Sequence, residues 1–243
     1  VHAAAMKQVP ACEYNPFEAI QTNVLGSQHI VDAAIDNGVK TVVALSTDKA
    51  VNPVNLYGAT KLCEEKLIVQ GNAYAAGSDA KLCCVRYGNV VGSRGSVVPV
   101  FREQIASGQL TITDARMTRF WITLDEAVDL VLYALEHTEG GEVFVPKIPS
   151  MKVTDLATCL APGIPHSIVG IRPGEKLHEV MITEDDSRST VELDDRYVIE
   201  PVFTYWSRRS FAEDGAKKVA EGFRFASDIN TQWLDHESLN KML

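Results

Sequence analysis

The chain has 243 residues, 46% of them hydrophobic, and is therefore long enough to bury a large core as one α/β domain with an appended lobe. Its formal net charge of −9 argues against nucleic acid as a partner, because no basic stripe offsets the acidic residues. No stretch approaches the roughly 20 apolar residues of a membrane span, and no signal peptide is visible.

The cysteines are odd in number and lack the spacing of metal ligands. We therefore expect buried, reduced thiols rather than disulfides, no metal site, and a cytoplasmic protein. The five positions are Cys12, Cys63, Cys83, Cys84 and Cys159.

The first forty residues predict the end of a strand followed by a helix. Residues 1–7 are typical of a strand tail that runs into a loop. The pair Asn15-Pro16 opens an amphipathic helix with proline at its first position, and Asn37-Gly38 closes it. Asn23 lies inside this helix, where a buried polar side chain needs a hydrogen-bond partner.

A buried parallel strand is predicted over residues 41–45, which have the required length and β-branched content. The sixteen residues that follow, 46–61, begin at the carboxyl edge of that strand, where open α/β sheets bind their ligands. Asn55 is a candidate cap for a helix that continues to about Gln70.

Tyr57 and Lys61 lie four residues apart on one face of that helix. An ammonium one turn from a phenol stabilises the phenolate, and we expect it to bring the tyrosine pKa from about 10 towards neutrality. Such a phenolate can take a proton from a hydroxyl. The same spacing also occurs on solvated helix faces, but Thr47, Asp48 and Lys49 at the strand end add a hydroxyl, an acid and a base.

The remaining elements alternate between strands and helices. The pattern predicts strands over residues 80–87, 110–113, 118–122 and 142–146 and near 168, and helices over 97–108, 123–137 and 153–160. Thr123 and Glu126 form a capping-box pattern at the start of the second of these helices.

Two loops carry groups that suit a nucleotide. Residues 88–96 are rich in glycine, which lets backbone N–H groups approach phosphate, but their spacing is not that of a dinucleotide-binding loop. Arg172 and Glu175 flank a Pro-Gly turn, where a guanidinium can fork onto phosphate and a carboxylate can accept two ribose hydroxyls. A Pro-Gly turn before a charged helix is the structural alternative.

The string S-T-D-K-A-V-N-P-V-N-L-Y-G-A-T-K at residues 46–61 resembles the inverting UDP-N-acetylglucosamine 4,6-dehydratases of the extended short-chain dehydrogenase/reductase superfamily, which act in pseudaminic acid and related bacterial surface-sugar pathways. The resemblance implies an α/β fold with a Rossmann-type doubly wound parallel sheet and a smaller C-terminal substrate-binding lobe. Residues 1–146 would form a partial NAD(P)-binding domain with the catalytic residues. Residues 147–243 would mainly form the substrate lobe, with a contribution from about 88–122.

The same resemblance implies NADP as cofactor, with NAD possible, UDP-N-acetylglucosamine as substrate, and a homo-oligomer. Members of the family carry a glycine motif upstream, and the chain resembles the C-terminal two-thirds or so of such an enzyme. The resemblance also implies that Asn23 props the active-site strand through backbone hydrogen bonds.

Four residues receive catalytic roles from the resemblance. Tyr57 would deprotonate the C4 hydroxyl, and Thr47 would hydrogen-bond the C4 oxygen. Lys49 would remove the C5 proton, and Asp48 would protonate the departing C6 hydroxyl. Because a base must be neutral, we expect the pKa of Lys49 to fall, coupled to that of Asp48.

Binding residues follow in the same way. The cofactor contacts implied are Ala3, Lys7, Ser46, Tyr57, Lys61, Tyr87, Asn89, Val90, Val91, Gly92, Ser93 and Arg94. The substrate contacts implied are Lys7, Tyr57, Asn89, Val97, Thr113, Arg119, Arg172 and Glu175.

Two alternatives remain at this point. A nucleotide-sugar 4-epimerase or a retaining dehydratase of the same superfamily would carry Tyr57 and Lys61 equally, although retaining dehydratases generally resemble an Asp-Glu pair where Asp48 and Lys49 stand. A UDP-sugar-binding fragment without turnover is the third reading, suggested by the missing glycine loop.

Overall fold

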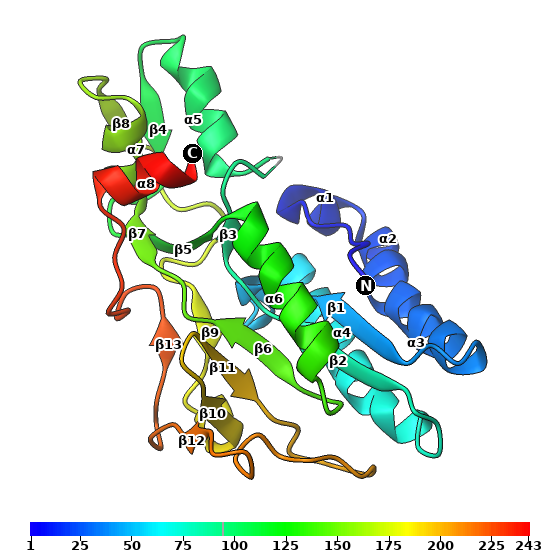
Figure 1. Cartoon of the computed structure of the whole chain (residues 1–243). Coiled ribbons are helices and arrows are strands. Elements are labelled where there is room, and N and C mark those ends of the chain that lie inside the picture. The colour runs from blue at the N-terminus through cyan, green and yellow to red at the C-terminus, as the bar shows by residue number, and fades with distance from the viewer. Residues whose placement is uncertain (94) are drawn as a thin grey trace.

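The structure is a computed structural model that describes residues 1–93 and 95–243 (Figure 1). Arg94, an expected cofactor contact, lies outside the described residues. Within the described part of the chain, no helix is long and apolar enough to cross a membrane.

A six-stranded mixed sheet forms the centre of the larger body. Its order is β1 (Thr41–Leu45), β2 (Lys81–Val85), β6 (Val143–Pro146), β11 (Arg196–Ile199), β10 (Thr190–Glu192) and β12 (Lys217–Lys218). The first three strands are parallel, as predicted, and the α/β fold class is confirmed. The last three are antiparallel, an extension that the sequence pattern did not predict.

Helices cover both faces of the parallel strands. Because both faces are buried, the sequences of these strands are continuously apolar. Helices α3 (Gly26–Asp36) and α4 (Leu56–Tyr74) pack on one face, and α6 (Leu124–His137) packs on the other. Side chains of β1 alternate accordingly: Val42 and Ala44 join the core under α3 and α4, whereas Val43 joins the core under α6.

The N-terminal segment confirms the predicted strand tail and helix, with two additions. His2 pairs with Ala44 in a single parallel bridge. The predicted helix is continuous through α2 (Pro16–Ile20) and α3, but a π-helical segment, Gln21–Leu25, separates them. A further helix, α1 (Val9–Tyr14), precedes it.

Asn23 lies in the π-helical segment and is fully buried, but its partners differ from those expected. Its amide nitrogen donates to the Met6 carbonyl and to the Thr60 hydroxyl, both at 2.9 Å, and its oxygen accepts from the Met6 N–H at 2.7 Å. The expectation that Asn23 props the active-site strand is therefore wrong. It fixes the N-terminal loop against α4 instead.

A smaller lobe lies at one end of the molecule, at the top left of Figure 1. It contains α5 (Val97–Ile105), β4 (Leu110–Ile112), α7 (Val153–Leu160), β8 (His166–Ile168) and α8 (His236–Met242). Its own core includes Phe101, Leu110, Trp121 and Leu156.

Short sheets connect the two bodies. They are β3 (Asn89–Val90) with β5 (Thr118–Ile122) and β7 (Ser150–Lys152), and β9 (Val180–Ile182) with β13 (Phe225–Ala226). Strands β10 to β12 come after residue 146 in the chain and yet lie in the main sheet. The predicted boundary between the cofactor-binding domain and the substrate lobe at residue 146 stays a prediction.

Two local predictions have different outcomes. The capping box at the start of α6 is confirmed, since Thr123 and Glu126 exchange side-chain and backbone hydrogen bonds. All five cysteines are free, as expected, but the expected burial is wrong for Cys63, which is exposed on α4, and Cys159 is only partly buried.

Candidate active site

The candidate site lies where β1 and β2 end. After β1 the chain enters a 3₁₀ turn, Asp48–Ala50, and then reaches the first turn of α4, which Asn55 caps by accepting from the Gly58 N–H at 2.8 Å. Gly58 lies directly on the turn, because a Cβ there would overlap the Lys49 carbonyl oxygen. The glycine next to Tyr57 thus lets α4 approach the Asp48–Ala50 turn closely.

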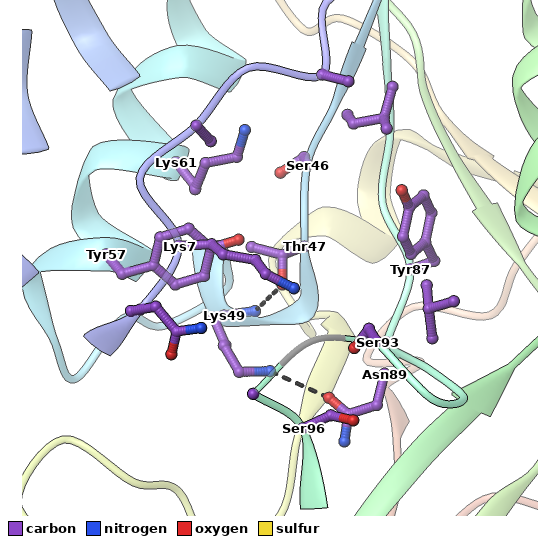
Figure 2. Close-up of a pocket in the computed structure, with 17 residues that line it drawn as sticks. Lys7, Ser46, Thr47, Lys49, Tyr57, Lys61, Tyr87, Asn89, Ser93 and Ser96 are labelled. Atoms are coloured by element: carbon purple, nitrogen blue, oxygen red, sulfur yellow. Dashed lines mark hydrogen bonds between the residues drawn. The ribbon is translucent and has the colours of Figure 1, made fainter. Parts of the chain in front are cut away.

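One cavity, of about 300 Å³, opens beside this turn and is called here the β1 cavity. Figure 2 shows Tyr57, Lys61 and Lys7 on one side of it and Tyr87, Asn89 and Ser93 on the other. Nine of the expected cofactor contacts line it, namely Ala3, Lys7, Ser46, Tyr57, Lys61, Tyr87, Asn89, Val90 and Ser93. Val91 and Gly92 are not among its lining residues.

A second cavity, of about 430 Å³, lies between the sheet and the smaller lobe and is called here the lobe cavity. The expected substrate contacts Val97, Thr113, Arg119, Arg172 and Glu175 all line it. Lys7, Lys49 and Asn89 line both cavities. Lys49 therefore stands at the junction of the two groups of residues that the sequence assigned to cofactor and to sugar nucleotide.

Asp48 and Lys49 form an ion pair at the base of this junction, with Nζ 3.0 Å from Oδ1. The same carboxylate oxygen accepts from the Thr47 hydroxyl at 2.9 Å, while Asp48 Oδ2 is buried and has no hydrogen-bond partner among the described residues. Lys49 Nζ also donates to Asn89 Oδ1 at 3.4 Å (Figure 2).

The pKa of Lys49 does not fall as expected. Burial lowers it, but the negative charges of Asp48 and Glu179 outweigh burial and hold the pKa above its ordinary value. The amine is therefore charged while Asp48 is charged, and the predicted fall is wrong for the ion-paired arrangement.

The pKa of Tyr57 also differs from the expected value. Burial raises the pKa of Tyr57 to about 12; Lys49 opposes this rise and Asp48 adds to it. The ammonium of Lys61 pairs with Glu64, with Nζ 2.5 Å from Oε2, and the charge of Glu64 adds to the rise of the Tyr57 pKa. The expectation that Lys61 brings Tyr57 towards neutrality is therefore wrong for this arrangement.

The arginines of the lobe cavity separate into two kinds. The Arg119 guanidinium donates to the Thr118, Lys176 and Leu177 carbonyls at 2.7 to 3.0 Å, so it braces the backbone of residues 172–179. Arg172 is exposed at the cavity wall. A third arginine, Arg116, lines neither cavity and pairs with Asp114 at 2.8 Å.

Sequence reasoning missed two buried networks at the site. Glu64 and Glu65 are buried on α4, and Glu65 accepts from the Ser46 hydroxyl at 2.5 Å and from Arg86 at 2.6 and 2.9 Å. Lys176, which pairs with Glu179, contacts the Asp48–Ala50 turn from the Arg172 loop. Both were visible only as charged residues, and nothing in their spacing distinguished them from a solvated helix or turn.

Comparison with known families identifies the chain. Residues 1–201 match the polysaccharide biosynthesis protein family. The chain belongs to this family. The match extends from the first residue through β1, α4 and the Arg172 loop to the end of β11, and so includes every predicted site residue.

Two known proteins are similar to this chain over almost its whole length. A UDP-N-acetylglucosamine 4,6-dehydratase (inverting) of Campylobacter jejuni is 53% identical, over 98% of this chain and 74% of the relative. A UDP-glucose 4-epimerase of Rickettsia canadensis is 43% identical, over 100% of this chain and 72% of the relative.

A solved structure has a similar fold. The crystal structure of Pen from Bacillus thuringiensis has a TM-score of 0.87 and 38% identity, and the match covers 99% of this chain and 73% of that one. The arrangement of sheet and smaller lobe is therefore shared with a known structure.

Proposed function

We propose that the chain is an inverting UDP-N-acetylglucosamine 4,6-dehydratase. It removes water through a 4-keto intermediate and gives UDP-2-acetamido-2,6-dideoxy-beta-L-arabino-hex-4-ulose for bacterial surface glycan synthesis. The single observation that carries the proposal is the position of Lys49, paired with buried Asp48 at the junction of the β1 cavity and the lobe cavity. The 53% identity to the Campylobacter jejuni enzyme supports it.

The β1 cavity suits a nicotinamide cofactor, and we propose NADP, with NAD open. The Tyr87 hydroxyl and the ammonium of Lys61, which gives one of its three protons to Glu64, offer donors for ribose hydroxyls and a carboxamide. The Ser46 and Thr47 hydroxyls donate to Glu65 and Asp48, so their oxygens are available as acceptors. Ala3 and Ala5 also line the cavity and add small apolar side chains to its wall. When bound, the cofactor supplies a hydride acceptor for C4 of the sugar and a hydride donor for C6.

The side chains around the junction would move the protons. Tyr57 takes the proton of the C4 hydroxyl, and Thr47 hydrogen-bonds the oxygen that becomes the ketone. The ketone acidifies the C5 proton, which Lys49 removes. Asp48 gives its proton to the C6 hydroxyl, which leaves as water, and reprotonation of C5 on the opposite face inverts that centre.

The ion pair explains how acid and base reach their working forms together. Transfer of one proton across the 3.0 Å contact from Lys49 to Asp48 makes a neutral amine and a carboxylic acid at the same moment. These are the forms that abstraction at C5 and elimination at C6 require.

The lobe cavity would hold the uridine diphosphate. Arg172 provides a guanidinium for phosphate, and Glu175 provides a carboxylate for ribose. Val97 and Thr113 line the wall between them and Lys49. We further propose a cytoplasmic homo-oligomer; the exposed aromatic rings of Tyr14 and Phe17 support self-association.

A 4-epimerase is the second candidate, favoured by the 43% identity to the Rickettsia canadensis protein. An epimerase needs Tyr57 and a bound cofactor but no acid and base at C5 and C6. The Asp48–Lys49 pair would then have no chemical task.

One experiment separates the candidates. The chain is incubated with NADP and UDP-N-acetylglucosamine in heavy water, and the product is examined by mass spectrometry and NMR. We expect a product lighter by one water, with deuterium at C5 and the L-configuration.

Two variants assign the steps. Lys49→Ala should oxidise C4 slowly but lose both C5 exchange and water release, whereas Tyr57→Phe should lose about 10² to 10⁴ in overall rate. A C4 epimer of unchanged mass would establish the epimerase instead. Near wild-type C5 exchange in Lys49→Ala, or a D-configured product, would refute the inverting mechanism.

A further inference from the structure

The loop over residues 172–179 contacts the catalytic turn directly. Lys176 Nζ donates to the Val51 carbonyl at 2.6 Å and to the Asp48 carbonyl at 3.2 Å. These two carbonyls border the 3₁₀ turn that carries Lys49. Two backbone bonds close the turn, from the Ala50 N–H to the Thr47 carbonyl at 3.1 Å and from the Val51 N–H to the Asp48 carbonyl at 3.2 Å, and the Lys49 N–H donates to the Thr47 hydroxyl at 3.3 Å.

Glu179 and Arg119 hold Lys176 in place. Its ammonium faces Glu179 Oε2 at 3.4 Å, and its own carbonyl accepts from Arg119 at 2.9 Å. Glu179 is itself buried. The side chain of Lys176 is 11% exposed, so the contact is largely shielded from solvent.

Two protons of the Lys176 ammonium are engaged by carbonyls, while Glu179 Oε2 faces the ammonium at 3.4 Å as a charge partner, without a hydrogen bond among the described residues. Lys176 lines the lobe cavity beside Arg172 and Glu175, but its donors point away from a ligand and towards the catalytic turn.

A second contact ties the same loop to the tyrosine helix. Asn55 Nδ2 donates to the Gly174 carbonyl at 2.7 Å, while its Oδ1 caps α4 through Gly58. Gly174 has a φ of 80°, and a Cβ there would lie 3.1 Å from the Asn55 Cβ. The loop of Arg172 and Glu175 is therefore joined both to the turn of Asp48 and Lys49 and to the helix of Tyr57.

We propose that Lys176 is a positioning residue that couples a nucleotide in the lobe cavity to the geometry of the Asp48–Lys49 turn. The inference rests on the proposed function, which places uridine diphosphate against Arg172 and Glu175. When the nucleotide orders residues 172–175, Lys176 becomes ordered as well. Lys176 then fixes the Asp48 and Val51 carbonyls on either side of Lys49.

The direct test uses UDP as the probe and needs no turnover. Amide hydrogen exchange is measured by NMR on the chain with and without saturating UDP. We expect UDP to slow exchange at Ala50 and Val51 by roughly tenfold in the wild type and to have no such effect in Lys176→Met, although the variant binds UDP with nearly unchanged affinity.

Lys147 provides a matched control. It also pairs with a carboxylate, Glu192 at 2.7 Å, and donates to a carbonyl, that of Asp194 at 3.2 Å, but it lines neither cavity. Lys147→Met should retain the UDP effect at Ala50 and Val51. Lys176→Arg, which keeps donors and charge, should restore part of it.

Kinetics give a second readout. Lys176→Met should lower kcat by roughly tenfold with little change in KM, because the contact acts on the catalytic turn and not on the ligand. A raised KM with unchanged kcat would make Lys176 a ligand contact and overturn the inference. UDP that binds the wild type without slowing exchange at Ala50 and Val51 would overturn it too, and would leave the proposed function standing. If UDP does not bind the wild type, the proposed function fails and this inference fails with it.

Discussion

At the scale of single residues, the pairing of Lys61 with Glu64 has a measurable consequence. Both side chains are buried, and Glu64 Oε1 has no hydrogen-bond partner among the described residues. Burial raises the pKa of Glu64 to about 7, although Lys61 opposes the rise. A cofactor or substrate that draws Lys61 away would therefore leave a carboxyl that is readily protonated.

The prediction concerns stability against pH. A carboxyl with a raised pKa in the folded chain binds a proton that the unfolded chain has released, so its contribution is complete below its unfolded pKa of about 4.5 and is lost as the pH rises through about 7. Glu64→Gln should remove this loss. Between pH 5 and 7 the wild type should lose stability relative to the variant by up to about 1.4 kcal/mol per pH unit, as measured by urea unfolding.

The control is the same change in an exposed pair. Glu237 pairs with Lys241 at 2.7 Å on α8, and its side chain is 79% exposed. Glu237→Gln should leave the pH dependence between pH 5 and 7 unchanged. A Glu64→Gln curve that runs parallel to the wild type would show that Glu64 does not hold a proton in this range.

Single residues also show how far the sequence could predict the site. The spacing of Tyr57 and Lys61 and the position of Asp48 and Lys49 after a strand located the four groups, because helix and strand geometry are local. The pKa directions were wrong because they depend on Glu64, Asp48 and burial. Burial is set by helices and strands that come from elsewhere in the chain.

At the scale of elements, the close approach of α4 to the Asp48–Ala50 turn depends on Gly58. An alanine there must displace the Lys49 backbone, which costs about 1–3 kcal/mol as overpacking, while its better helix propensity returns about 1 kcal/mol. Gly58→Ala should therefore lower stability in urea unfolding. It should also lower C5 exchange, because the shift moves Lys49.

Gly26 offers the opposite case on α3. A Cβ there would meet its nearest neighbour, the Gln21 carbonyl oxygen, at an ordinary 3.5 Å. Gly26→Ala should leave C5 exchange unchanged and raise stability by up to about 1 kcal/mol. Equal effects of the two substitutions would show that the contact at Gly58 has no special role.

Elements were predictable where their signals are local. The strand at 41–45, the Asn55 cap and the Thr123 capping box follow from residue type and spacing. The π-helical segment Gln21–Leu25 was not predictable, since its residues suit an ordinary helix. Strands β10 to β12 were missed because they join the main sheet through the pairing of β11 with β6, which lies far from β11 in the chain.

At the scale of the whole molecule, the Arg172 loop belongs to the smaller lobe side and yet contacts the catalytic turn. Two of its residues, four positions apart, face different ways: Arg172 is exposed at the wall of the lobe cavity, and Lys176 is turned towards Asp48 and Val51. Under the proposed function, Arg172 holds the nucleotide and Lys176 aligns the Asp48–Lys49 pair, so that one loop has two separate tasks.

This separation predicts contrasting kinetics for Arg172. Arg172→Ala removes a guanidinium that would bind phosphate equally in the ground state and the transition state, so KM should rise roughly 10- to 100-fold while kcat changes little. Arg116→Ala is the control, because Arg116 is 72% exposed, pairs with Asp114 and lines neither cavity; its KM should stay at the wild-type value. Initial rates over a range of UDP-N-acetylglucosamine concentrations measure both constants. An unchanged KM in Arg172→Ala would place the diphosphate away from this loop, whereas a fall in kcat alone would mean that Arg172, like Lys176, acts on the catalytic turn.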